Sequence, residues 1–489
     1  MNNTLKHMLL VSSCLSTVCA VAEKPNIVLF LVDDLGWGDL GYNGSTFHLT
    51  PNIDAFARES TVFSDAYAYP TCSPSRACLI TGQNTPRHGI YRVEAYKPAP
   101  EPYKKLRDVK SGHFYEGSAP TIGDVMKRAG YTCGYIGKWH MGDRPETMPP
   151  GRGFDVNIAG CGFGNPPSYF SPYKNPELSD GPDGEYLPER LLDETLKFIN
   201  EHSTGDRPFF LIHATYLVHR PVQAKDEYTE LFKTRTPDAG RSNPEYAAMV
   251  YAMDVEFGRL MQGLKNAGVF ENTLIVFISD NGVNPVCAKG TPLRSCKASV
   301  YEGGIRVPMI AHWTGRTAPQ VCNVPVSILD LLPTFLSAAG GTADGLTLDG
   351  ENILPLFSGG TLQRDALYWH HPCYTIPTVF VENVRENYAY WDDDEMFIPP
   401  ANERGDWVRP CSVIRAGDYK LIHEYETGTD ELYNLKTDLG EEKNLAAELP
   451  EKVSELREKL TAWLKEMDAV IPCEPNPAYN PEYRQRPEE

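Results

Sequence analysis

Basic residues are scarce in this sequence, and their scarcity limits what the chain can bind. The 46 Lys and Arg residues stand against 65 Asp and Glu residues, which gives a net charge of −19. A protein that binds nucleic acid or an anionic membrane needs a basic face, so we expect neither partner. If the substrate is an anion, the cations that bind it must be gathered in one place.

Long apolar runs are missing after the first residues, so we expect no transmembrane segment. Residues 1–22 resemble a secretory signal, with Lys6 near the start, an apolar core and an Ala-Val-Ala cleavage site ending at Ala22. We therefore predict an exported protein, either periplasmic or secreted. A lipid anchor at Cys14 is one alternative, because "VSSC" resembles a bacterial lipobox, and a buried N-terminal helix is another.

Cys-x-x-Cys pairs and internal repeats are also missing. Of the 12 cysteines, two fall in the signal segment and the other ten are irregularly spaced. An exported protein can hold disulfides, although their connectivity cannot be read from a sequence. Cys373 and Cys411, which bracket one polar loop, are the candidate pair.

The length and composition indicate a globular chain with one large domain and a smaller one. The chain has 489 residues, of which 41% are hydrophobic, and 40 Gly and 40 Pro make it rich in loops. Three continuous apolar runs, Asn26–Val32, Pro208–Ala214 and Thr273–Ser279, are typical of buried parallel strands. Helical patterns lie between them, which predicts an α/β sheet with helices on both faces.

The pattern changes after about residue 365. Short alternating runs with a Gly turn between 412 and 435 predict an antiparallel hairpin or meander, and an amphipathic helix follows at 449–467. We therefore expect a signal peptide over 1–22, a large domain over 23–365 and a smaller α+β subdomain over 366–489.

Polar side chains directly follow two of the predicted strands. Asp33 and Asp34 follow the first, and Asp280 and Asn281 follow another. In sheets of this kind, ligands bind beyond the carboxyl ends of the strands. If the two strands are neighbours, the four side chains form a hard-oxygen set, which suits Ca²⁺ or Mg²⁺ and not zinc. The alternative is a set of ordinary strand-end turns.

Cys72 stands in a tight turn within the stretch "YPTCSPSRACLITGQ". Ser73 is a good N-cap, Pro74 a good first helical residue and Gly82 a natural stop. A helix N-terminus favours anions and lowers the pKa of a thiol, so Cys72 could be a reactive residue. A disulfide with Cys78 or a metal site is the alternative at this point.

The residues from Cys72 to Arg76 resemble the C-x-P-x-R signature of type I, formylglycine-dependent sulfatases, and "ACLITGQ" continues the match. Further blocks are similar to the family, in family order, over nearly the whole mature chain: "PNIVLFLVDDLGWGDLGYNG", "TPNIDAFARES", "GYTCGYIGKWHMG", "YLVHRP", "ISDNG", "LRSCKASVYEGGIRVP" and "DYKLIHEYETGTDELYNLKTDLGEEKNLA". This ordered set is far more specific than the short signature alone. The chain looks most like the arylsulfatase and N-acetylgalactosamine-sulfatase type of carbohydrate sulfatase.

The resemblance implies an alkaline-phosphatase-like α/β sandwich, with a large mixed, mostly parallel sheet flanked by helices and a smaller C-terminal subdomain that holds an antiparallel sheet. The domain over 23–365 would be the catalytic one. The implied activity is hydrolysis of sulfate monoesters on a sulfated glycan, with sulfated galactose or N-acetylhexosamine as the expected unit. The alternatives are a phosphonate or phosphate ester hydrolase of the same superfamily and a non-catalytic glycan-binding relative.

The resemblance also assigns roles to single residues. A formylglycine-generating or anaerobic sulfatase-maturating enzyme would convert Cys72 into 3-oxoalanine (formylglycine), whose hydrate would be the nucleophile. The Ca²⁺ ligands would be residue 72 together with Asp33, Asp34, Asp280 and Asn281. The catalytic cations and acid–base groups would be Arg76, Lys138, His140, His219 and Lys297, of which Lys138, His219 and Lys297 would also bind the substrate. For each of these residues, an ordinary core or loop position is the alternative.

One block departs from the pattern of the family. Relatives often carry a Trp-His-Tyr-Pro-His-Tyr-like run, whereas this chain reads "YWHHPCY", with Cys373 in place of His, before a long polar segment. We interpret His370, His371 and Trp391 as sugar contacts on a pocket wall, and a variable surface excursion is the alternative. The aromatic, Gly-rich segment at 160–173 is a second candidate for sugar contacts, with internal packing as the alternative.

Overall fold

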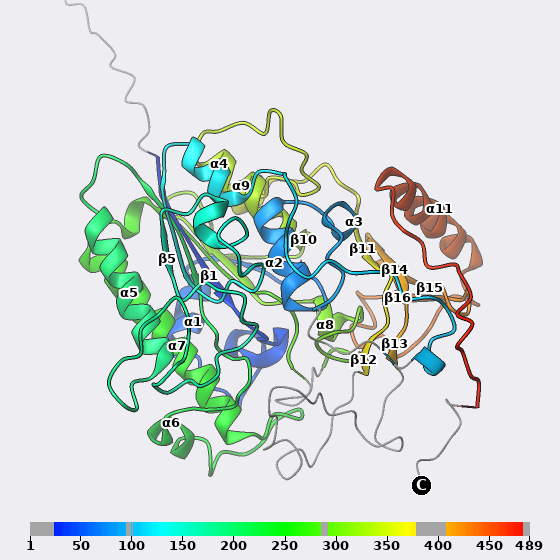
Figure 1. Cartoon of the computed structure of the whole chain (residues 1–489), viewed down its shortest axis with the longest axis horizontal. Coiled ribbons are helices and arrows are strands. Elements are labelled where there is room, and N and C mark those ends of the chain that lie inside the picture. Colours follow the sequence, from blue (N-terminus) through cyan, green and yellow to red (C-terminus); the bar gives the residue numbers. More distant parts are fainter. Residues whose placement is uncertain (1–23, 94–98, 100, 285–291, 378–406, 483–489) are drawn as a thin grey trace, which may run out of the picture.

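The computed structural model describes residues 24–93, 99, 101–284, 292–377 and 407–482. Its larger part is a mixed, mostly parallel sheet of eight strands in the order β5-β4-β6-β1-β7-β8-β2-β9, with helices on both faces (Figure 1). The strands are β1 (Asn26–Val32), β2 (Thr61–Phe63), β4 (Thr132–Gly137), β5 (Val156–Ile158), β6 (Phe209–Ala214), β7 (Thr273–Ser279), β8 (Met309–His312) and β9 (Gln320–Cys322). The predicted fold class is confirmed, and the three predicted strands form the centre of the sheet as β1, β6 and β7.

The two faces of the sheet bury alternate residues of β1, as expected for a strand that is covered on both sides. Ile27, Leu29 and Leu31 belong to the core under α2, α4 and α9, whereas Val28, Phe30 and Val32 belong to the core under α1, α5 and α7 (Figure 1). These helices are α1 (Pro51–Arg58), α2 (Cys72–Thr81), α4 (Ile122–Arg128), α5 (Leu187–His202), α7 (Pro244–Asn266) and α9 (Leu331–Ala338).

Shorter elements complete the larger part. The helices α3 (Thr85–His88), α6 (Asp226–Glu230) and α8 (Glu302–Ile305) lie in its connections, and β3 (Ala66–Tyr67) pairs with β10 (Val326–Ser327). Among the described residues, we find no helix that combines the length and the apolar character needed to cross a membrane.

A second sheet lies in the C-terminal part of the chain (Figure 1). Its four antiparallel strands, in the order β11-β14-β15-β16, are β11 (Ala366–His371), β14 (Cys411–Ala416), β15 (Tyr419–Glu424) and β16 (Asp430–Asn434). Leu456, Leu460 and Trp463 of α11 (Pro450–Glu466) pack on this sheet, so the predicted antiparallel strands and amphipathic helix are confirmed. A short pair, β12 (Thr375–Pro377) with β13 (Trp407–Val408), stands beside them.

The predicted disulfide between Cys373 and Cys411 is wrong. Nine cysteines lie in the described part of the chain, and all nine are free thiols. Cys411 is opposite His371 in the β11–β14 ladder, and the Cys373 thiol donates to the Val109 carbonyl at 3.2 Å. The predicted signal peptide at 1–22 and Trp391 lie outside the described residues.

Buried charges join the C-terminal sheet to the larger part. Lys420 of β15 pairs with Glu302 of α8 at 3.0 Å and with Glu441 at 2.8 Å, and all three residues are fully buried. Glu302 also pairs with Arg306 at 3.0 Å and accepts the hydroxyl of Tyr67 at 2.8 Å. These side chains are buried, so each charge depends on its partners in the protein.

We expect the substitution Lys420→Met to destabilise the protein by about 3–5 kcal/mol, because it leaves the buried Glu441 without its cation and Glu302 with Arg306 alone. Urea unfolding followed by circular dichroism measures the change. The matched control is Lys436→Met, which removes an exposed pair with Asp418 at 3.8 Å and should change stability by about 0–1 kcal/mol. Equal unfolding midpoints for the two variants would contradict this account of the interface.

Candidate active site

Cys72 is the first residue of α2, and only 1% of its surface is exposed. Thr71 is the N-cap, so the helix begins earlier than predicted from Ser73 and Pro74. The Ser73 hydroxyl donates instead to the His140 carbonyl at 3.3 Å, which ties α2 to the segment after β4. Gly82 ends the helix with φ at +64°, as predicted.

The carboxyl ends of β1 and β7 bring four polar side chains together. The two strands pair in parallel, with Val32 opposite Ser279, so Asp33 and Asp34 lie beside Asp280 and Asn281. All four are fully buried. The Asp34 backbone, at φ +62°, donates its N–H to Asp280 Oδ1 at 3.2 Å.

Two oxygens of this group have no hydrogen-bond partner within the described structure: Asp33 Oδ1 and Asn281 Oδ1. Ligand atoms of Asp33, Cys72 and Asp280 lie within 4.8 Å of one another, and so do those of Asp33, Asp34 and His219. Buried oxygens are costly when they lack partners. A hard cation would satisfy them, so the residues present fit an oxygen-ligated metal.

Three cations surround the carboxylates. Lys138 pairs with Asp33 at 2.7 Å and Lys297 with Asp34 at 2.5 Å. Arg76 donates from Nε to Asp280 at 2.9 Å. When all three carboxylates are ionised they balance the three cations, so a bound divalent metal would leave the cluster positive and suited to an anionic substrate.

Gly137 allows Lys138 to reach this position. The backbone of Gly137 has φ +108°, and an added Cβ would lie 1.9 Å from the Ala214 carbonyl oxygen. The next residue, Lys138, donates its backbone N–H to that same oxygen at 2.8 Å. Only glycine fits a backbone that turns this close to β6.

The carboxylates and Cys72 differ in their ionisation. Burial raises the pKa of Asp33 to about 8, although Lys138 opposes this effect. Burial acts on Asp34 as well, but the charge of Lys297 opposes it most strongly, and the pKa of Asp34 lies below the usual range. Burial also raises the pKa of the Cys72 thiol, contrary to the lowering predicted from its helix N-terminus. An unmodified Cys72 is therefore a poor thiolate nucleophile.

Two histidines face this cluster. His140 Nδ1 lies 3.3 Å from Cys72 Sγ, and His219 Nε2 lies 3.5 Å from Asp34 Oδ2. His219 Nδ1 is 2.8 Å from the Arg220 carbonyl, which fixes the proton on that nitrogen. Burial lowers the pKa of both rings well below its ordinary value, so both are neutral and able to accept a proton.

The structure does not bring His370 and His371 into this cluster. Both lie in β11 and are 2% exposed. The two ring nitrogens of His370 contact Ser412 Oγ at 2.7 Å and the Val470 carbonyl at 3.1 Å, and His371 Nε2 bonds the Thr375 hydroxyl. Because both rings are buried and hydrogen-bonded within the protein, they are not placed to make the predicted contact with a sugar. Their hydrogen bonds stabilise the C-terminal sheet instead.

Two contacts in the site were missed in the sequence. Asn284 Nδ2 donates to Asp34 Oδ2 at 3.3 Å, but a single Asn beyond a turn gives no pattern. Gly164 packs against His140, so that an added Cβ would lie 2.6 Å from the imidazole Cε1. The Gly-rich composition of 160–165 was a signal for such a close approach.

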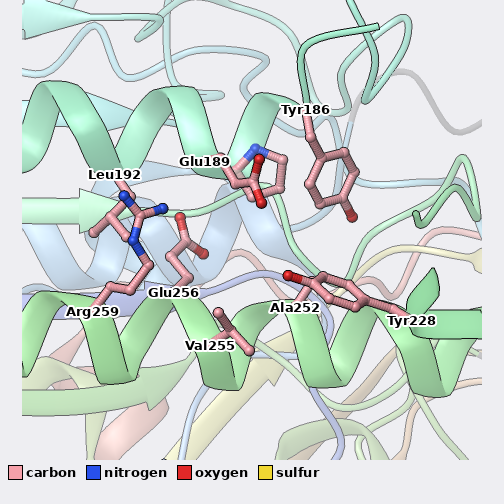
Figure 2. A pocket seen from close by; sticks show the side chains of 9 residues that line it. Tyr186, Glu189, Leu192, Tyr228, Ala252, Val255, Glu256 and Arg259 are labelled. Atoms are coloured by element: carbon pink, nitrogen blue, oxygen red, sulfur yellow. The ribbon is translucent and has the colours of Figure 1, made fainter. Parts of the chain in front are cut away.

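A hollow elsewhere in the molecule is distinct from this cluster. It lies between α5 and α7 and is lined by residues that include Tyr186, Glu189, Glu256 and Arg259 (Figure 2). These two helices cover the core opposite to that of α2, so the hollow does not open onto Cys72.

Comparison with known proteins identifies the family. The sulfatase family model matches residues 25–341. N-acetylgalactosamine-6-sulfatase of Mus musculus is 35% identical over 396 residues, which cover 74% of this chain and 72% of that protein. Arylsulfatase A of Homo sapiens is 30% identical over 94% of this chain and 91% of its own length.

A solved structure agrees with these sequences. The crystal structure of Ps i-CgsB in complex with k-i-k-neocarrahexaose superposes with a TM-score of 0.72 at 30% identity, covering 90% of this chain and 93% of that one. The family match extends from β1 to the end of α9 and includes the Cys72 cluster. The chain therefore belongs to the sulfatase family and is a sulfuric ester hydrolase.

Proposed function

We propose that this protein removes sulfate from a sulfated glycan, using a formylglycine formed from Cys72 and a Ca²⁺ bound between the ends of β1 and β7. The observation that carries the proposal is the surroundings of Cys72: a buried residue at a helix N-terminus, beside three cations and two unpartnered oxygens. One relative is named N-acetylgalactosamine-6-sulfatase, and Ps i-CgsB was solved in complex with k-i-k-neocarrahexaose. Both names favour a sugar ester, and the resemblance to the family implies a sulfated galactose or N-acetylhexosamine unit.

The metal would be held by Asp33, Asp34, Asp280 and Asn281, together with residue 72. Carboxylate and amide oxygens are the ligands that Ca²⁺ prefers, and Asp33 Oδ1 and Asn281 Oδ1 lack other partners among the described residues. When bound, the ion offsets the negative charge of the sulfate oxygens. It would also favour the ionised form of Asp33, whose pKa is raised to about 8 by burial.

Formylglycine would supply, as its hydrate, one hydroxyl that attacks and a second through which the aldehyde is restored. The modification explains why a cysteine with a raised pKa stands at the centre of a cationic site. Because Cys72 is 1% exposed, a maturating enzyme would have to reach it before the chain folds. We infer that residues 1–22 direct export to the periplasm or the outside of the cell.

The protein's own side chains would position the ester and move protons. Lys138 and Lys297 bind sulfate oxygens, and Asp280, which accepts a hydrogen bond from Arg76 Nε at 2.9 Å, takes up a proton as a general base. His219 gives a proton from Nε2 to the departing sugar oxygen, after the anionic ester has raised its proton affinity. His140 accepts a proton at Nδ1, the atom that faces residue 72 at 3.3 Å.

We expect Cys72→Ala to lower the kcat for 4-nitrophenyl sulfate by more than about 10³-fold, because it removes the nucleophile. The circular dichroism spectrum should stay that of the parent protein. Cys78→Ala is the matched control, since Cys78 lies on the same helix, is equally buried and should retain activity. Full activity of Cys72→Ala would show that another residue is the nucleophile.

Removal of the metal with EDTA should lower both the activity and the melting temperature, and added Ca²⁺ should restore both. A ligand at 100 times its Kd stabilises by about 2.7 kcal/mol, so a rise of several degrees is expected. Asn281→Ala should abolish this Ca²⁺-dependent rise. The control Asn352→Ala, which removes a remote hydrogen bond to Ser337, should keep it. A melting temperature indifferent to Ca²⁺ in the parent protein would contradict the metal site.

The substrate class is tested by comparing sulfate and phosphate esters of the same alcohol. We expect a higher kcat/KM for 4-nitrophenyl sulfate than for 4-nitrophenyl phosphate. Among sulfated sugars, we expect turnover of N-acetylgalactosamine 6-sulfate or of a galactose sulfate. Faster turnover of the phosphate ester would instead favour a phosphate or phosphonate ester hydrolase.

A further inference from the structure

The loop at 160–165 is built directly onto His140. The His140 backbone N–H donates to the Cys161 carbonyl at 3.0 Å, and Gly164 is so close to the imidazole that an added Cβ would lie 2.6 Å from Cε1. His140 in turn lies 3.3 Å from Cys72 Sγ. The loop therefore contacts His140, and His140 contacts the reacting residue 72.

The same segment also supports the second histidine. The Tyr169 hydroxyl donates to the His219 carbonyl at 2.9 Å and to the Tyr216 carbonyl. Tyr169 is fully buried, so these bonds are shielded from water. The segment from Cys161 to Tyr169 thus spans both histidines of the candidate site.

Aromatic side chains lie together where this loop contacts the segment at residues 113–115. An added Cβ on Gly162 would lie 3.4 Å from Phe114 Cζ, which places Phe114 against the loop. The rings of His113 and Phe114 lie 3.9 Å apart, and His113 is exposed. The next residue, Tyr115, donates its N–H to the Met141 carbonyl at 3.0 Å, which holds this segment beside the His140 strand end.

Phe163 is the exposed member of the loop. It is 39% exposed and stands between Cys161 and Gly164, both of which contact His140. The described residues include four other large hydrophobic side chains with equal or greater exposure, and none of them is next to a residue that contacts the site. Phe163 thus offers an exposed apolar ring on the loop that contacts His140, whose Nδ1 lies 3.3 Å from Cys72 Sγ.

We propose that Phe163, with Phe114 and His113, forms a stacking surface for a pyranose ring of the glycan, adjacent to the sulfate pocket. This inference rests on the function proposed above and names the part of the protein that recognises the sugar. The C–H face of a pyranose is apolar and packs on an aromatic ring. The cations that would bind sulfate are Arg76, Lys138 and Lys297, so these aromatic residues would contact the sugar ring and not the sulfate.

The test compares Phe163→Ala with the parent protein on the sulfated sugar that the parent hydrolyses with the highest kcat/KM. We expect KM to rise about tenfold, which corresponds to about 1.4 kcal/mol, with a smaller change in kcat. The Ki of inorganic sulfate, which occupies only the sulfate pocket, should be unchanged. Phe163→Tyr should restore the KM of the parent.

The matched control is Leu231→Ala, which removes a side chain that is 45% exposed and lies beyond α6; it should leave KM unchanged. An unchanged KM in Phe163→Ala, or a weaker Ki for sulfate equal to the change in KM, would overturn the stacking surface and leave the proposed function standing. A parent protein that hydrolyses 4-nitrophenyl sulfate but no sulfated sugar would refute the glycan function and this inference together.

Discussion

The parallel pairing of β1 with β7 is the constraint on which the site depends. Because Val32 and Ser279 are opposite each other in the ladder, the two strands end together, and their next residues supply three carboxylates and an amide at one edge. Both strands are apolar and buried on both faces, which places them at the centre of the sheet. The chemistry of the site is therefore a consequence of how the core packs.

Burial makes the arrangement of charges specific. Three separate segments supply the cations Arg76, Lys138 and Lys297. Each has a carboxylate partner, at 2.8, 2.7 and 2.5 Å respectively. In a chain with a net charge of −19, such a group is where an anionic ester can bind. The same rule holds at Lys420, where paired charges fix the C-terminal sheet against the larger part.

Strands and strand ends could be predicted from the sequence because they depend on local patterns: β1 and β7 coincide with the predicted runs. The burial of a side chain by residues that are distant in the sequence could not be predicted in this way. His370 is enclosed by Ser412 and Val470, which are 42 and 100 residues away, and the register of β11 with β14, which separates Cys373 from Cys411, is a tertiary property. Asn284 was missed because one side chain makes no pattern.

The central claim is that residue 72 acts as an aldehyde and not as a thiol. The most direct test is the mass of the peptide that contains residues 70–76, measured on active protein isolated from its native host. The account predicts the mass of formylglycine at position 72, in a fraction that rises with specific activity. An active preparation in which every such peptide carries the thiol mass would contradict it.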